Sequence, residues 1–215
     1  MALPRVLELG DLSGLSPKEI EKVRDLVERS NITGNNILER EVIPNIARYG
    51  LHVKDTGTEA GLGIFTTEKI PKDEIISVVV AHVTTQGSGR YLYHLQKDVF
   101  GIDKTIFFDG KHRLDDFENR AVNANFINND CTRANSFSQI VPGKALIVTI
   151  TSREIRAGEQ IKIAYGRGYF DDDDATLEKI LIKEEADRKG DTSVGPVRHC
   201  ICKGDYCFYG RSFID

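Results

Sequence analysis

The chain has 215 residues, of which 40% are hydrophobic and 29% are charged, and its formal net charge is −4. This apolar content and low net charge exclude a mainly disordered chain. The chain has 19 glycines without a triplet repeat and only 4 cysteines, which excludes collagen-like and disulfide-dense proteins. The length suffices for one sizeable core.

Composition and charge also limit where the chain works and what it binds. No apolar run reaches about 18 residues, so we expect no membrane span. The first residues lack the basic and apolar stretches of a signal peptide, which favours an intracellular location. The mild acidity argues against direct nucleic-acid binding, because that function usually needs a basic face.

Two helices are predicted in residues 1–50. Ser16, Pro17 and Glu19 occupy the cap, first and third positions of a capping box at the start of the first helix. A second helix is predicted at about 36–48, where apolar residues recur at helical spacing. Its apolar stripe consists of Ile37, Val42, Ile43 and Ile46. Because both helices carry apolar stripes, we expect this segment to pack against the rest of the chain.

Short β-branched runs replace the helical pattern from about Leu51. Strands are predicted at 75–80, 104–108, 145–150 and 160–164. Glycine, proline and Asn-Asp clusters separate these runs, which indicates long connections and not a regular βαβ alternation. The residues therefore predict a mostly β fold with minor α content.

The chain divides into four expected parts. An N-terminal helical segment at 1–50 precedes a main domain at 51–166. A helical insertion and linker follow at 167–199, beginning with an acidic run that is favourable at a helix N-terminus. A short tail at 200–215 ends the sequence.

All four cysteines can serve one metal site. Cys200, Cys202 and Cys207 lie close together in the tail, and Cys131 lies far upstream. Four thiolates complete a tetrahedral zinc site, which would attach the tail to the main domain. Two disulfides and four buried free thiols are the alternatives. A Cys-x-Cys bridge is strained and no secretory signal is present, so we predict zinc.

Three further segments are ordinary turns or strand ends when each is taken alone. Gly61-Leu62-Gly63 permits either a turn or a close approach of the backbone to a ligand. Asn128-Asn129-Asp130 follows an apolar pair and favours a loop. Tyr165 ends the predicted strand at 160–164 and is followed by glycine.

In this order, these segments and the cysteines resemble the SET-domain protein-lysine methyltransferases with a cysteine-rich post-SET tail. The glycine pair is similar to the family's Gly-x-Gly element. The segment 128–131 is similar to its Asn-His-Ser-Cys signature, with Asn129 in place of histidine and Asp130 in place of serine. The segment 158–166 is similar to its Gly-Glu-Glu-Leu-(x3)-Tyr-Gly ending. The resemblance covers the chain from about Leu51 to its end.

The resemblance implies a SET-like fold of several small antiparallel sheets with a knot-like core, in which the signature and Tyr165 segments thread past each other. It implies S-adenosylmethionine as cofactor, and a protein lysine, with a histone tail as one candidate, as substrate. A histone substrate would imply a nuclear location. Tyr165 is the implied catalytic residue, and the zinc ligands are the four cysteines. The implied cofactor-binding residues are Gly61, Leu62, Gly63, Tyr91, Asn128, Asn129 and Tyr169.

The implied reaction needs a neutral lysine amine, although the reference pKa of lysine is about 10.4. An apolar channel beside a cationic sulfonium disfavours the charged amine, and the Tyr165 hydroxyl would then orient it. The candidate channel walls are Tyr93, Phe137, Tyr169 and Phe170.

Two other functions stay open at this point. One is a SET-like binding module without turnover, which recruits protein partners through its acidic insertion and is favoured by the altered Asn129 and Asp130. The other is a zinc-stabilised domain of unrelated fold, favoured if Tyr165 and the glycine pair lie far apart.

Overall fold

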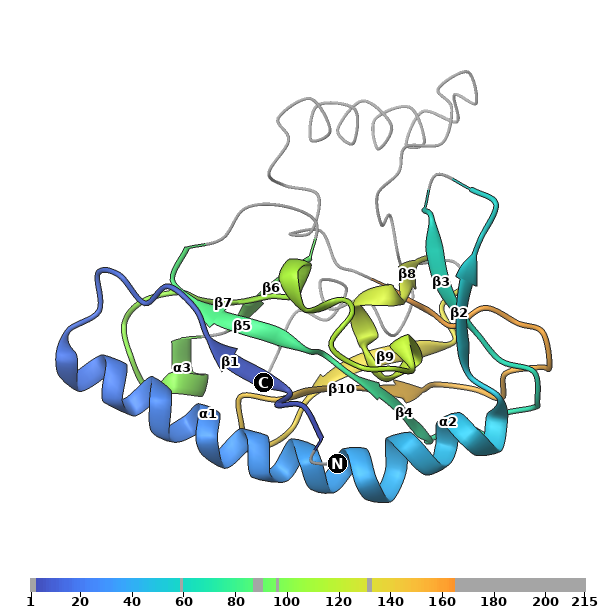
Figure 1. The fold of residues 1–215 in the computed structure, drawn as a ribbon, viewed down its shortest axis with the longest axis horizontal. Helices are drawn as coiled ribbons and strands as arrows, with labels where there is room; N and C mark the ends of the chain where they lie inside the picture. Colours follow the sequence, from blue (N-terminus) through green and yellow to red (C-terminus); the bar gives the residue numbers. More distant parts are fainter. Residues whose placement is uncertain (1–2, 59, 87–90, 96, 131–132, 165–215) are drawn as a thin grey trace, which may run out of the picture.

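The computed structural model of the chain describes residues 3–58, 60–86, 91–95, 97–130 and 133–164. They form a mixed fold of several small sheets and one long N-terminal helix (Figure 1). The expected insertion at 167–199 and the expected tail at 200–215 lie outside the described residues.

The N-terminal helical region is one continuous helix and not the two predicted helices. It comprises α1 (Pro17–Ile37), a π-helical turn η1 (Leu38–Val42) and α2 (Ile43–Tyr49). The predicted capping box is confirmed, since Ser16 accepts from the Glu19 N–H and Glu19 bonds back to the cap.

A proline explains why the helix changes its hydrogen-bond spacing in the middle. Pro44 has no N–H to donate to the carbonyl four residues earlier. Just before it, the N–H of Ile43 donates to the carbonyl of Leu38, five residues back, which is the spacing of a π turn. The π turn therefore lets the helix continue past the proline up to Gly50, which ends it with a left-handed φ of 60°.

The largest sheet has four strands in the order β1 (Leu7–Leu9), β5 (Ala81–Thr84), β7 (Ile106–Asp109) and β6 (Leu92–Leu95). The strand β1 precedes the long helix within the expected N-terminal helical segment, where no strand was predicted. It pairs in parallel with β5, and the buried Asn31 of α1 bonds both the N–H and the carbonyl of Leu7 at 2.8 Å. Three residues are too few for a periodic pattern, so only these tertiary contacts define the strand.

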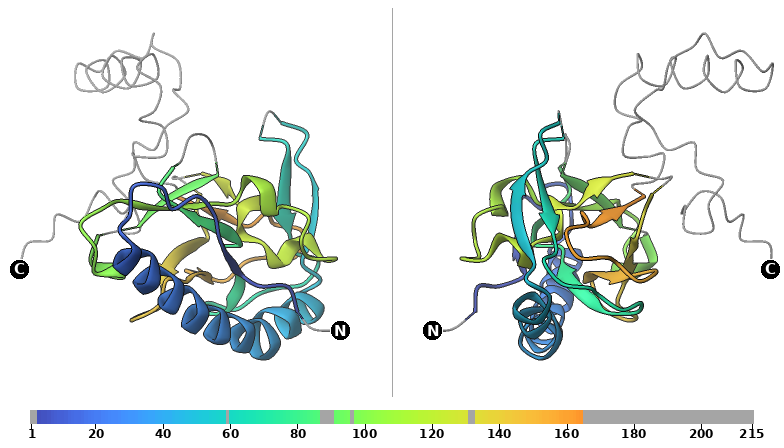
Figure 2. Two further views of the ribbon diagram at one scale, coloured as in Figure 1. Left: turned by 60° about the vertical axis from the view of Figure 1, so that its left-hand side comes forward. Right: turned by 90° about the vertical axis from the view of Figure 1, so that its right-hand side faces the viewer.

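The other sheets are smaller. One has three antiparallel strands in the order β4 (Ile75–Val78), β10 (Ile147–Thr151) and β9 (Ser136–Ile140). The hairpin of β2 (His52–Asp55) and β3 (Leu62–Phe65) projects from the body on the side away from the helix (Figure 2). The last pair, β8 (Asn128–Asn129) and β11 (Lys162–Ile163), is parallel.

The predicted strands at 75–80, 104–108, 145–150 and 160–164 are confirmed with shifted ends. Most strand pairs are antiparallel, as expected, and the pairs β1–β5 and β8–β11 are parallel. Short helical turns complete the described fold: α3 (Lys97–Phe100), η2 (Lys111–Arg113), η3 (Arg120–Val122) and η4 (Ala124–Phe126).

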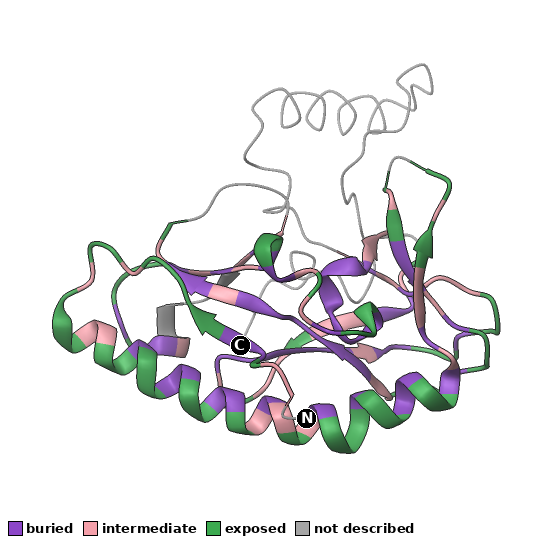
Figure 3. Cartoon of the chain, in the orientation of Figure 1, coloured by how far each residue is buried: buried purple, intermediate pink, exposed green. Residues whose placement is uncertain are grey.

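The long helix packs its inner face against the sheets, as expected. Val23, Leu38 and Val42 have no exposed surface and share one hydrophobic core with Ile76 and Ile147 of the three-stranded sheet. Figure 3 shows buried positions along the inner side of the helix and exposed positions along its outer side. No helix among the described residues is both long and apolar enough to cross a membrane.

Candidate active site

The signature segment lies beside the strand that precedes Tyr165 in the sequence. Asn128 and Asn129, predicted as part of a loop, form β8 and pair in parallel with Lys162 and Ile163. The N–H of Asp130 extends this ladder by donating to the carbonyl of Ile163 at 3.0 Å. The expected threading of this segment past the Tyr165 segment lies outside the described residues, which end at 164.

The glycine hairpin contacts the signature segment. The side-chain amide of Asn128 donates to the carbonyl of Leu62 at 3.0 Å. A Cβ atom at Gly63 would lie 2.9 Å from the Asn128 amide nitrogen and 2.4 Å from that of Gln160. Gly63 therefore leaves room for these two side-chain amides, and the structure brings together two elements that the sequence predicts for the cofactor.

Gly61 has a different role in the same hairpin. Its φ of +70° lies in the left-handed region that favours glycine, and an added Cβ would meet no atom within 4 Å. Its carbonyl accepts hydrogen bonds from the Thr56 N–H at 2.8 Å and the Thr56 hydroxyl at 2.7 Å. Gly61 therefore shapes the turn, and open space lies beside it.

A buried asparagine that sequence reasoning did not assign connects the two crossing segments. Asn135 has no exposed surface, and its amide nitrogen donates to the Gln160 carbonyl at 2.8 Å and to a Glu159 carboxylate oxygen at 3.1 Å. Its amide oxygen accepts from the Lys162 N–H at 2.9 Å. The sequence signal was only its place shortly after Cys131, where this chain has Thr-Arg-Ala-Asn and the family resemblance has the one-residue-shorter x-Pro-Asn.

The Glu159 carboxylate stays ionised in this network. Hydrogen bonds from the Arg153 guanidinium lower its pKa from 4.5 to about 2, with smaller contributions from the Arg156 N–H and Asn135. The side chain of Glu159 is 28% exposed. The turn before β11 is thus fixed by charged and amide groups around one carboxylate.

The remaining predicted site residues lie on other strands or outside the described chain. Tyr91 precedes β6, where its carbonyl accepts from the Gly110 N–H at 3.0 Å. Tyr93 and Phe137, predicted channel walls, lie on the four-stranded and three-stranded sheets and are partly buried. The predictions for Tyr165, Tyr169, Phe170, Cys131, Cys200, Cys202 and Cys207 fall outside the described residues.

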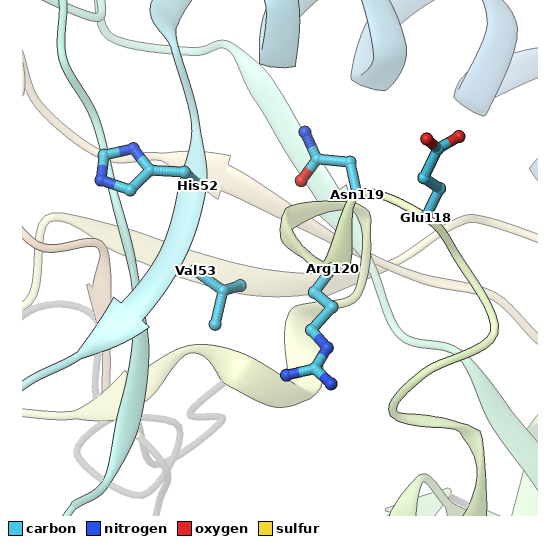
Figure 4. Close-up of a pocket in the computed structure, with 5 residues that line it drawn as sticks. All are labelled: His52, Val53, Glu118, Asn119 and Arg120. Carbon is cyan, nitrogen blue, oxygen red and sulfur yellow. The ribbon is translucent and has the colours of Figure 1, made fainter.

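A shallow depression of about 450 Å³ lies apart from these residues, between β2 and η3. Figure 4 shows His52 and Val53 on β2, beside the segment that carries Glu118, Asn119 and Arg120, and these five residues line the depression. Arg120 is already paired with Asp115 at 2.6 Å. The depression contains none of the predicted catalytic or cofactor residues. Within the described part of the chain, no group of three or more His, Cys, Asp or Glu residues could hold a metal ion.

Comparison with known proteins finds one family model that matches this region. Residues 61–166 match the family model of the SET domain. This range includes the glycine pair, β8 and β11. Among solved structures, the chain is similar to CpSET8 from Cryptosporidium, with 15% identity and a TM-score of 0.45. That match covers 78% of this chain and 83% of the other. No curated protein matches the chain.

Proposed function

We propose that the chain is an S-adenosylmethionine-dependent methyltransferase that acts on a lysine side chain of a protein. The SET-domain match supports this function. The observation that carries it is the hydrogen bond between Asn128 and Leu62 at 3.0 Å, because it joins two elements that the family resemblance assigns to the cofactor. We propose a histone tail as the first substrate to test, with a nuclear location if that test succeeds.

The residues around this contact fit the methionine part of the cofactor. Asn128 uses its amide N–H on Leu62, so its amide oxygen can accept from an ammonium group. Gly61 leaves open space beside the hairpin backbone, where a side chain would otherwise project. When bound, S-adenosylmethionine supplies the methyl group. Gly61, Leu62, Gly63, Asn128 and Asn129 would hold and orient it.

The protein's own residues would prepare the lysine. An apolar channel disfavours the ammonium form of the substrate lysine and lowers its pKa. We assign to the Tyr165 hydroxyl the orientation of the neutral amine, and such alignment accounts for much of the rate in a reaction of this kind. Tyr169 is proposed as an aromatic contact to cofactor and channel.

We also propose one zinc ion held by Cys131, Cys200, Cys202 and Cys207. Four thiolates are a complete donor set for structural zinc. The ion would attach the tail to the signature segment directly after Asp130, and so link zinc content to the integrity of the cofactor site.

Calorimetry with S-adenosylmethionine tests the proposed function first. We expect the wild-type chain to bind the cofactor, Asn128→Ala to bind about tenfold more weakly, and Asn36→Ala to bind normally. Asn36 is the matched control because it is exposed on the outer face of α1. Transfer of a labelled methyl group to a histone panel and to cell lysate then tests the substrate. Cofactor binding without any transfer would favour the binding module, and absence of binding would contradict the proposal.

A further inference from the structure

One ion pair joins the two short strands of the candidate site. The ammonium of Lys162 on β11 lies 2.8 Å from a carboxylate oxygen of Asp130, which directly follows β8. The two side chains are 25% and 22% exposed. Most of the other ion pairs among the described residues are on the surface, such as Lys69–Glu154, whose side chains are 64% and 55% exposed.

The ion pair lies on the same face of the strand pair as Asn128. Side chains alternate between faces along a strand, so Asn128 and Asp130 share a face of β8. Lys162 is in register with Asn128 and therefore stands on that face of β11. The Asn128 side chain on this face bonds Leu62, so the ion pair lies beside the proposed cofactor contact.

Both partners are also held through other bonds. The second carboxylate oxygen of Asp130 accepts from the Arg133 N–H at 3.1 Å. The N–H of Lys162 donates to the side chain of Asn135 at 2.9 Å, and its carbonyl accepts from the Asn135 N–H at 3.1 Å. The Lys162 ammonium and the Asp130 carboxylate therefore contact each other between two backbone segments, each of which is held by further hydrogen bonds.

A two-residue ladder is a weak determinant of register, because few backbone bonds oppose a shift. A partly buried ion pair resists such a shift more than a surface pair does, because solvent screens it less. We infer that Lys162, through Asp130, is a positioning residue that keeps Asn128 in place against Leu62. This inference rests on the proposed function, and a serine at position 130 could not form such a pair.

The test compares four variants of the full zinc-loaded chain. Lys162→Met removes the charge and keeps most of the stem, and Asp130→Asn keeps an acceptor for Arg133. Lys162→Arg keeps the charge. Lys69→Met removes the exposed ammonium of the surface pair and is the control. The rate of hydrogen exchange at the Asp130 backbone amide is measured without cofactor. The dissociation constant of S-adenosylmethionine is measured by calorimetry.

We expect Lys162→Met and Asp130→Asn to exchange the Asp130 amide faster and to bind S-adenosylmethionine about tenfold or more weakly, since a small misplacement is costly at such a site. Lys162→Arg should bind within about threefold of wild type, and Lys69→Met should match wild type.

Two results would overturn the inference. Unchanged exchange in Lys162→Met would exclude positioning, whether or not the cofactor binds. Faster exchange with unchanged cofactor affinity would show a purely structural role. If the wild type binds no cofactor, the proposed function fails and the role in cofactor binding fails with it, while the exchange data still report on the strand register.

Discussion

The amide of Asn128 donates a 3.0 Å hydrogen bond to the carbonyl of Leu62, 66 residues away in the sequence. A glycine stands beside this bond, and a Cβ at residue 63 would lie 2.9 Å from the Asn128 nitrogen and displace it. The glycine pair therefore has two separate physical roles. Gly61 shapes a turn, and Gly63 gives room to another segment.

Gly63→Ala should weaken cofactor binding more than it destabilises the fold. The new methyl group must displace the ends of the Asn128 and Gln160 side chains, which are flexible, at a cost of about 1 kcal/mol in unfolding free energy. Losing the Asn128 contact should weaken S-adenosylmethionine binding about tenfold, as calorimetry would show. Gly143→Ala, at a remote turn where an added Cβ meets no atom within 4 Å, is the control for a glycine replacement away from the site. Equal effects of the two changes on cofactor affinity would contradict this prediction.

Glu159 should make stability depend on acid pH. Its pKa in the folded chain is about 2, below its ordinary value of 4.5, so its stabilising contribution is present above pH 4.5 and is lost as the pH falls toward about 2. The full pKa shift corresponds to about 3 kcal/mol in the free energy of unfolding. Solvent screening reduces the expected contribution to about 1 kcal/mol. Urea unfolding of wild type and Glu159→Gln should therefore differ at pH 6 and converge at the acid end. A constant difference across that range would count against the assignment.

The long helix should contribute to the stability of the whole described fold. Leu38 is fully buried in the π turn, and its change to alanine should lower the free energy of unfolding by about 2–5 kcal/mol. Ile32 is 66% exposed on the same helix, and its change to alanine should lower the free energy of unfolding by less than about 0.5 kcal/mol. Denaturant unfolding measures both. Similar small effects at both positions would mean that the helix packs more loosely than its burial indicates.

Tyr165→Phe should keep the fold and cofactor binding but lose most methyl transfer. Only the hydroxyl is removed, so the change acts on the orientation of the amine and lowers kcat more than binding. A hydrogen bond of this kind can contribute about 10²–10³ in rate. Initial rates of methyl transfer to one substrate are measured for both proteins. A Tyr165→Phe rate within about threefold of the wild-type rate would show that Tyr165 is not catalytic.

Zinc content should be one ion per chain in protein purified without chelator. Cys131→Ser should lower the zinc content, and because Cys131 follows Asp130 in the sequence, we also expect weaker cofactor binding. Metal analysis checks the first expectation and calorimetry the second. Markedly less than one zinc per wild-type chain would exclude the four-cysteine site.

Local patterns were enough to predict several elements. The capping box at Ser16 and the β-branched runs near Ile76 and Val148 act through neighbouring residues, and the structure confirms a helix and strands there. The order of the glycine pair, signature and tyrosine motifs was likewise sufficient for the family resemblance, which the SET-domain match at 61–166 supports.

Other features depend on contacts between distant segments. No local pattern marks Leu7–Leu9 as a strand, because its hydrogen bonds come from β5 and from Asn31. The parallel pairing of Asn128 with Lys162, and the close packing of side chains against Gly63, likewise join segments more than 30 residues apart. The sequence determined which residues could form local elements and which motifs were present. Only the tertiary structure decided which motifs meet, because side-chain hydrogen bonds and close packing depend on proximity in space and not in the chain.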